Sequence, residues 1–101
     1  MTDDGPNELD NSVFTGPDLS FSIIVPVHNG GRPFRKCLLS LAALAHPPKE
    51  IIVVADGETD GSWRLAEAVD AQVVKLPAPV GPAAARNRGA NVATGDILFF
   101  V

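Results

Sequence analysis

Polar side chains follow two apolar runs of the sequence, where they could bind a ligand. His28 and Asn29 come directly after the run 21–27, and Asp56 comes directly after the run 50–55. An ionised carboxylate accepts hydrogen bonds and donates none. Asp56 therefore suits a ligand edge with N–H donors, such as N3 of uracil or N1 and N2 of guanine, and opposes cytosine, whose N3 is an acceptor. The alternative is an ordinary Asp-Gly turn in which the carboxylate bonds its own backbone.

Arg86 is a further candidate, because it falls in the first turns of a predicted helix that follows a loop rich in proline and glycine. Its planar guanidinium could bind a base edge or a diphosphate, or it could be a solvated surface group. Asn29 precedes Gly30 and Gly31, which would let the backbone approach a ligand, although a plain turn has the same composition. His28 is expected to pack or stack at a strand end, and we do not assign it as a general base.

The elements that must position these residues are strands and helices in alternation. Four short apolar runs predict strands, at 21–27, 50–55, 71–76 and 96–101. Helical spacing of apolar residues predicts three helices between them, at 33–45, 63–69 and 83–92. Gly95 is expected to close the last helix as a left-handed cap. This alternation predicts a mainly parallel sheet in a Rossmann-like, three-layer α/β/α fold.

The carboxyl ends of the predicted strands locate a binding edge. Ligands of open parallel sheets bind outside these ends. The edge would bring together Val27 to Asn29, the pair Asp56 and Gly57, and the loop before Arg86. This expectation follows from the strand pattern alone.

Charge divides the 101 residues into two parts. The first 20 contain five acids and no base, and we expect residues 1–20 to form a disordered acidic tail. Removing the tail from 12 acids and 8 bases leaves seven against eight, so the net charge of −4 belongs to the tail. Residues 21–101 would form the single folded part. A near-neutral body lacks the basic surface of a nucleic-acid-binding protein.

Further absences in the sequence exclude other classes. Cys37 is the sole cysteine, which rules out an intrachain disulfide and fits a reducing compartment. No apolar run approaches the roughly 20 residues that span a bilayer. No metal-ligand cluster has convincing spacing, and no Gly-x-x-x-x-Gly-Lys-Ser/Thr loop is present. We expect a cytoplasmic protein, with the inner face of the membrane as a second location for a longer form.

Three segments, taken together, resemble the family 2 glycosyltransferases, which are enzymes of the GT-A fold. The first is the opening strand Ser22-Ile23-Ile24-Val25-Pro26-Val27-His28-Asn29. The second is Glu50-Ile51-Ile52-Val53-Val54-Ala55-Asp56-Gly57-Glu58-Thr59-Asp60. The third is Gly81-Pro82-Ala83-Ala84-Ala85-Arg86-Asn87-Arg88-Gly89, continued by Ala93-Thr94-Gly95-Asp96. They span nearly all of residues 21–101.

The resemblance implies a sugar donor linked to uridine or guanosine diphosphate and a hexosyltransferase-like enzyme of polysaccharide or glycoconjugate synthesis. The acceptor would be a saccharide, a lipid or a protein. The residues expected to bind the nucleotide sugar are Pro26, Val27, His28, Asn29, Asp56, Gly57 and Arg86.

The catalytic parts of the family follow the strand that matches 96–101. There an Asp-x-Asp motif binds Mg²⁺ or Mn²⁺, and a later carboxylate is the general base for transfer with inversion. The resemblance thus implies a truncated GT-A fold in which 21–101 are the nucleotide-sugar-binding portion. We assign no catalytic and no metal-binding residue, and expect the isolated chain to be inactive.

Three residues depart from the family pattern. Ala55 replaces the first acid of an Asp-Asp pair, His28 replaces an aromatic residue, and Glu58 replaces a serine. Asp56, which matches the acid that contacts the base, is kept. The departures concern the identity of the donor and its affinity more than the fold.

Two other functions fit part of the pattern. A non-catalytic nucleotide-binding or interaction module would have the same sequence features. A dinucleotide-dependent oxidoreductase would need Gly-x-Gly-x-x-Gly in the first loop, which instead reads Asn29-Gly30-Gly31-Arg32-Pro33. In the family the strand matching 96–101 is expected to lie inside the sheet, so its edge would be exposed in this chain. This exposure predicts self-association through the sheet edge or marginal stability of the isolated chain.

Overall fold

The computed structural model describes residues 19–57, 60–61 and 63–101. These residues form β1 (Phe21–Val27), α2 (Gly31–Ala42), β2 (Glu50–Asp56), α3 (Trp63–Ala68), β3 (Gln72–Leu76), α4 (Pro82–Val92) and β4 (Ile97–Phe100). Strands and helices alternate as the sequence predicts. The helix α2 differs from the helix predicted at 33–45. It begins two residues before the predicted start, at Gly31, and ends before the predicted end, at Ala42. Glu58 and most of the predicted tail lie outside the described residues.

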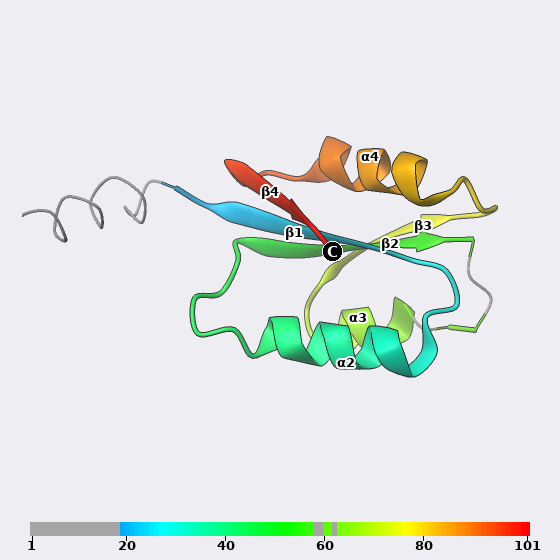
Figure 1. The fold of residues 1–101 in the computed structure, drawn as a ribbon, viewed down its shortest axis with the longest axis horizontal. Helices are drawn as coiled ribbons and strands as arrows, with labels where there is room; N and C mark the ends of the chain where they lie inside the picture. The colour runs from blue at the N-terminus through cyan, green and yellow to red at the C-terminus, as the bar shows by residue number, and fades with distance from the viewer. Residues whose placement is uncertain (1–18, 58–59, 62) are drawn as a thin grey trace, which may run out of the picture.

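The four strands form one parallel sheet with the order β3-β2-β1-β4. The chain moves outward from β1 to β3 and then returns to the other side of β1. Because crossovers between parallel strands are right-handed, this reversal puts the third helix on the opposite face from the first two. Figure 1 shows α4 on one face and α2 and α3 on the other. The predicted three-layer α/β/α fold is confirmed.

The pleat of the strands divides the core into two layers. Successive side chains of a strand point to opposite faces of the sheet. The cluster on the side of α2 and α3 consists of Ile23, Val25, Val27, Phe34, Leu38, Val53 and Ala66. The cluster on the side of α4 consists of Ile24, Ile52, Val54, Leu76 and Ala85. Asp56 has the same parity as Val54, so its side chain emerges on the α4 side.

Gly95 does not have the role predicted for it. The C-cap of α4 is Ala93, whose backbone is extended, and Gly95 is not among the glycines with positive φ. A Cβ at Gly95 would lie 2.6 Å from Ser22 Oγ and 2.8 Å from the carbonyl carbon of Phe21. The glycine is therefore needed because the chain crosses close to β1 before it enters β4.

A polar network joins the beginnings of the strands. Ser22 Oγ and Thr94 Oγ1 donate hydrogen bonds to Glu50 Oε2, at 2.7 and 2.9 Å, and the Thr94 N–H donates to the same oxygen. The Ser22 hydroxyl and then the Thr94 N–H lower the pKa of Glu50 below its ordinary value. The network lies at the amino ends of the strands, away from the predicted binding edge.

Ser20 belongs to the folded part. The Asp96 N–H donates to the Ser20 carbonyl at 2.9 Å, and the Ser20 N–H donates to Asp96 Oδ2 at 3.0 Å. The structure thus includes in the fold Ser20, which the sequence prediction had assigned to the tail. The reason is a pairing between segments 76 positions apart, which local composition does not reveal.

Strand β4 is the outer strand of the described sheet on the side of β1. It pairs with β1 alone among the described strands. Ile97, Phe99 and Phe100 are 44%, 53% and 48% exposed. Among the described residues, no helix is both long and apolar enough to span a membrane.

Candidate functional site

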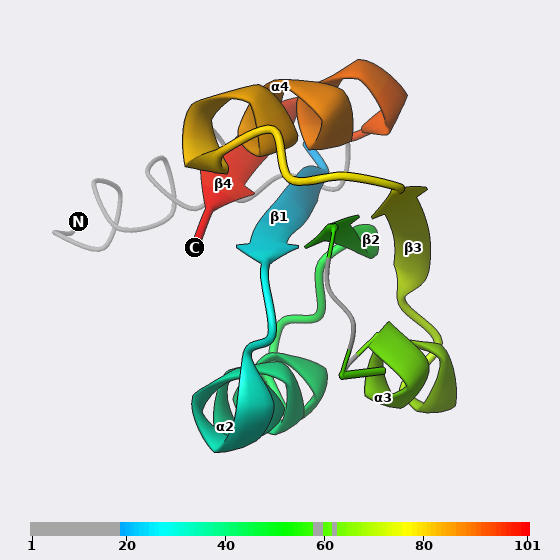
Figure 2. The ribbon, with the colours of Figure 1, turned by 90° about the vertical axis from the view of Figure 1, so that its right-hand side faces the viewer.

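The site is built at the carboxyl ends of β1 and β2, which are turned toward the viewer in Figure 2. After β1, the chain turns at Asn29, whose φ is 50°, and enters α2. After β2, it turns at Gly57, whose φ is 68°. Both turns use the left-handed region, which glycine and asparagine adopt more readily than other residues. The two turns place the residues that follow the strands side by side.

Asp56 is the buried acid of the site, with 5% of its surface exposed. The Val80 N–H donates to its Oδ1 at 2.7 Å, and the Gly81 N–H donates to its Oδ2 at 3.1 Å. The carboxylate is thus bonded to the loop before α4 and not to its own Asp-Gly turn. Each carboxylate oxygen has two acceptor positions. These two bonds use one position on each oxygen, and the second position can accept a hydrogen bond from a ligand.

His28 ties the two strand ends together. Its Nδ1 lies 2.8 Å from the carbonyl oxygen of Asp56. Because a carbonyl only accepts, Nδ1 carries the hydrogen of this bond, which fixes the tautomer of a neutral ring. The side chain is otherwise exposed.

Asn29 and Gly57 have structural contacts beside the site. Asn29 Oδ1 accepts a hydrogen bond from the Asp60 N–H at 3.2 Å. Gly57 lies against the backbone of Pro79. Neither lines the pocket described next, in contrast to the five other residues predicted to bind the nucleotide sugar.

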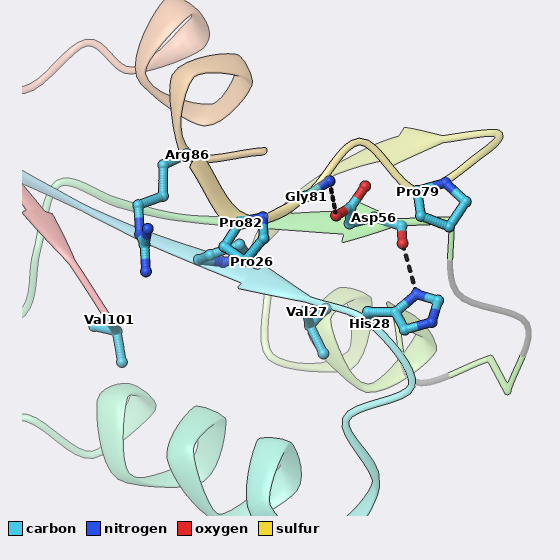
Figure 3. Close-up of a pocket in the computed structure, with 9 residues that line it drawn as sticks. All are labelled: Pro26, Val27, His28, Asp56, Pro79, Gly81, Pro82, Arg86 and Val101. Atoms are coloured by element: carbon cyan, nitrogen blue, oxygen red, sulfur yellow. Dashed lines mark hydrogen bonds between the residues drawn. The ribbon is translucent and has the colours of Figure 1, made fainter. Parts of the chain in front are cut away.

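An open pocket of about 440 Å³ occupies the α4 side of the strand ends. Its lining residues are Pro26, Val27, His28, Asp56, Pro79, Gly81, Pro82, Arg86 and Val101, which Figure 3 draws as sticks. The pocket adjoins the boundary between β1 and β4, where the strand order reverses. Ligands of open α/β sheets bind at such switch points.

Four lining residues were missed by the sequence prediction: Pro79, Gly81, Pro82 and Val101. The first three belong to the loop before α4 and to its first residue, a segment that the sequence placed at the binding edge without naming single residues in it. The fourth follows β4 and reaches the pocket because β4 pairs with β1. A prediction that placed the last strand next to the first would have found it.

The two ends of the pocket differ in charge. Arg86 extends from the second turn of α4 toward the strands, as Figure 3 shows, and its side chain is exposed. Asp56 lies at the other end beside the proline-rich loop. A carboxylate accepts hydrogen bonds and a guanidinium donates them. The pocket therefore suits a ligand with N–H donors at one end and negative charge at the other.

The described residues do not fit a metal site by themselves. No three histidine, cysteine, aspartate or glutamate side chains gather there in a way that could hold an ion. No role at this pocket is therefore assigned to a metal.

Comparison of the sequence with known proteins finds matches to one family of enzymes. The sequence model of "Glycosyl transferase family 2" matches residues 22–101. The uncharacterized glycosyltransferase YibD of Escherichia coli (strain K12) is 42% identical over 84 residues, which are 79% of this chain and 24% of YibD.

Solved structures give the same result for the fold. S. aureus TarS 1-349, in complex with UDP-GlcNAc, matches with a TM-score of 0.76 and 31% identity over 82% of this chain and 26% of TarS. Glucosyl-3-phosphoglycerate synthase from Mycobacterium tuberculosis, in complex with Mn²⁺, UDP and glucosyl-3-phosphoglycerate, matches with a TM-score of 0.70 and 26% identity over 99% of this chain and 37% of the synthase.

The chain spans between 24% and 37% of the length of these proteins. The family match covers both turns, the loop before α4 and all lining residues of the pocket. The order of the segments and the arrangement of the sheet agree with the GT-A fold of the solved relatives. The chain belongs to glycosyl transferase family 2.

Proposed function

We propose that this chain binds the nucleotide part of a UDP- or GDP-sugar donor, as the donor-binding portion of an enzyme that transfers the sugar to an acceptor hydroxyl with inversion. Family membership supports the transferase class. A UDP-GlcNAc complex of TarS and a UDP complex of the mycobacterial synthase support a nucleotide donor.

The observation that carries the proposal is that Asp56 and Arg86 line one pocket. The base would lie toward Asp56, which offers acceptor positions beyond those that Val80 and Gly81 occupy. The diphosphate would lie toward Arg86, whose planar guanidinium suits phosphate oxygens. Pro26 and Pro82 would form a rigid apolar wall between these two polar ends.

The donor preference follows from the acceptor character of Asp56. Uracil presents N3–H and guanine presents N1–H and N2–H₂, whereas cytosine presents a lone pair at N3. A carboxylate facing that lone pair would leave two acceptors in contact. An unsatisfied buried polar group costs about 1–3 kcal/mol. The expected discrimination against cytidine diphosphate is therefore about tenfold or more.

Titration calorimetry of the full chain with UDP, GDP and CDP tests this proposal. UDP or GDP should bind more tightly than CDP. Arg86→Gln should weaken binding of the preferred nucleotide about tenfold, since it removes a charge-assisted contact. Arg88→Gln is the matched control, because Arg88 is also exposed on α4 but does not line the pocket. Equal weak binding of all three nucleotides, or equal effects of the two substitutions, would contradict the proposal.

We further propose that the 101 residues bind the donor without transferring the sugar. The relative in complex with Mn²⁺ indicates divalent metal use in the family, but the described residues bring no three metal-binding side chains together. Nucleotide affinity should accordingly be unchanged when EDTA replaces Mn²⁺ in the titration. Turnover of a radiolabelled UDP-sugar by this chain would overturn the proposal of binding without transfer.

A further inference from the structure

We infer that Asp56 and Gly57 are positioning residues that hold the loop 77–81 against the end of β2, and so place the start of α4 and Arg86 over the pocket. The consequence for binding rests on the proposed nucleotide function. The anchoring itself concerns contacts within the chain. It gives Asp56 a role in addition to contact with a base.

The first part of the anchor is the Asp56 carboxylate. It accepts hydrogen bonds from the N–H groups of Val80 and Gly81, the two residues that immediately precede α4. The next residue, Pro82, has no N–H to offer. A negative charge is also favourable at the N-terminus of a helix, where the peptide dipoles leave a partial positive charge. The carboxylate of β2 thus bonds the N–H of the N-cap residue Gly81 and that of the residue before it, whereas α4 has no side-chain cap of its own.

The second part of the anchor is the close contact at Gly57. Its N–H donates to the Leu76 carbonyl at 3.0 Å. A Cβ at Gly57 would lie 2.4 Å from the backbone nitrogen of Pro79 and 2.8 Å from the carbonyl carbon of Ala78. Backbone atoms cannot move aside as the tip of a flexible side chain can. The absence of a side chain at Gly57 therefore lets the loop lie directly on the strand end.

The anchored loop shapes the pocket. Pro79 and Gly81 line it, and so does Pro82, the first residue of α4. Arg86 follows Pro82 by about one helical turn, so its direction depends on where the helix starts. Hydrogen bonds to an ionised carboxylate are stronger than those between neutral groups. Loss of these bonds should consequently loosen the wall of the pocket that carries Arg86.

Val80→Pro tests the anchor without changing Asp56. Proline removes the N–H that donates to Oδ1, whereas Val80→Ala keeps it and is the matched control. UDP affinity, measured by calorimetry, should fall about tenfold in V80P and remain near that of the unchanged chain in V80A. The double variant D56N/V80P should lose less than the product of the two single losses, because both changes weaken the same contact between the side chain of residue 56 and the loop. Unchanged affinity in V80P would overturn the inference.

Gly57→Ala gives a second test in case V80P does not fold. Gly61→Ala is its control, since Gly61 also has a positive φ of 75° but its added Cβ would meet only the Arg64 side chain, at 3.6 Å or more. G57A should weaken UDP binding more than G61A does, by about tenfold, because its collision is with backbone. Equal binding by the two folded variants would count against the anchor.

Hydrogen exchange of the Val80 and Gly81 amides tests their hydrogen bonds to Asp56 without any ligand. Both amides should be protected in the unchanged chain, and at least one of them should exchange at least tenfold faster in Asp56→Asn, in which one acceptor oxygen is replaced by a donor. Equal protection in D56N would overturn the anchor even if UDP binds. Failure of the unchanged chain to bind UDP or GDP would overturn the proposed function, while the exchange rates would still decide the anchor.

Discussion

At the scale of single residues, the negative charge of Glu50 stabilises the fold through hydrogen bonds. Its Oε2 accepts hydrogen bonds from the Ser22 hydroxyl and from the backbone and side chain of Thr94. These bonds favour the ionised form and lower its pKa. One carboxylate thereby joins the beginnings of β1 and β2 to the segment that leads into β4.

Glu50→Gln should lower the melting temperature of the chain at neutral pH. Because the pKa of Glu50 in the folded state is below the ordinary value of 4.5, the ionised carboxylate stabilises the fold above about 4.5, and this contribution is lost as the pH falls through the lowered pKa. The difference in melting temperature between E50Q and the unchanged chain should therefore be largest near neutrality and shrink below 4.5. Thermal melts over a pH series measure it.

The control for this series is Glu67→Gln on α3. Glu67 is exposed, and its carboxylate makes no hydrogen bond within the part of the chain that the structure describes. E67Q should follow the unchanged chain at every pH. A constant difference for E50Q across the series would contradict the assignment of its effect to the carboxylate charge.

At the scale of elements, the packing of α4 on the sheet depends on small residues. Ala85 is fully buried, and Gly89 lies one turn later on the same side of the helix. A Cβ at Gly89 would lie 2.5 Å from Ile24 Cγ2 and 3.1 Å from Val54 Cγ2. The distance between helix and sheet is thus set by the lack of a side chain at this position.

Gly89→Ala should destabilise the fold, although alanine is the better helix former. Its intrinsic gain is about 1 kcal/mol, and overpacking a tight core costs about 1–3 kcal/mol. We expect a net loss of roughly 1 kcal/mol, because the contact at Ile24 is with a β-branched side chain that has little freedom. Urea unfolding monitored by circular dichroism measures this difference.

Asn91→Ala is the comparison for that substitution. Asn91 is exposed on α4, so alanine there brings the helix propensity gain without a collision. N91A should be as stable as the unchanged chain or slightly more stable. A stabilising effect of G89A equal to that of N91A would show that the sheet relaxes to accept the extra methyl group.

At the scale of the whole molecule, the sheet presents an apolar edge. Ile97, Phe99 and Phe100 are each more than 40% exposed, and β4 pairs with β1 alone among the described strands. Strand edges with unpaired backbone groups and apolar side chains pair with other chains. Self-association through this edge therefore remains a prediction for the isolated chain.

Sedimentation velocity over a range of protein concentrations tests the prediction. The sedimentation coefficient should rise with concentration for the unchanged chain, and Ile97→Lys should shift it toward the monomer, because a charge on an edge strand opposes pairing. Leu39→Lys is the control, since Leu39 is 45% exposed and belongs to the helix α2, not to the edge strand. A monomer at all concentrations, or equal effects of I97K and L39K, would contradict it.

Much of the architecture was predictable because it depends on local patterns. Short β-branched runs separated by helical periodicity determined the order of strands and helices, and hence the parallel sheet. The strand pattern also located the sheet edge at which the pocket lies, because Asp56 ends β2 and His28 follows β1. Five of the seven predicted site residues line the pocket.

The remaining features depend on contacts between distant segments, which only the tertiary structure decided. The partners of the Asp56 carboxylate are 24 and 25 residues away in the chain, and the contact that requires Gly95 is with β1. Local composition indicates that a carboxylate or a glycine is present, but not which group the crossovers will bring against it. The sequence alone therefore indicated the family and the sheet edge at which the pocket lies, whereas the packing of β4 and α4 on β1 and β2 decided which groups each side chain at that edge contacts.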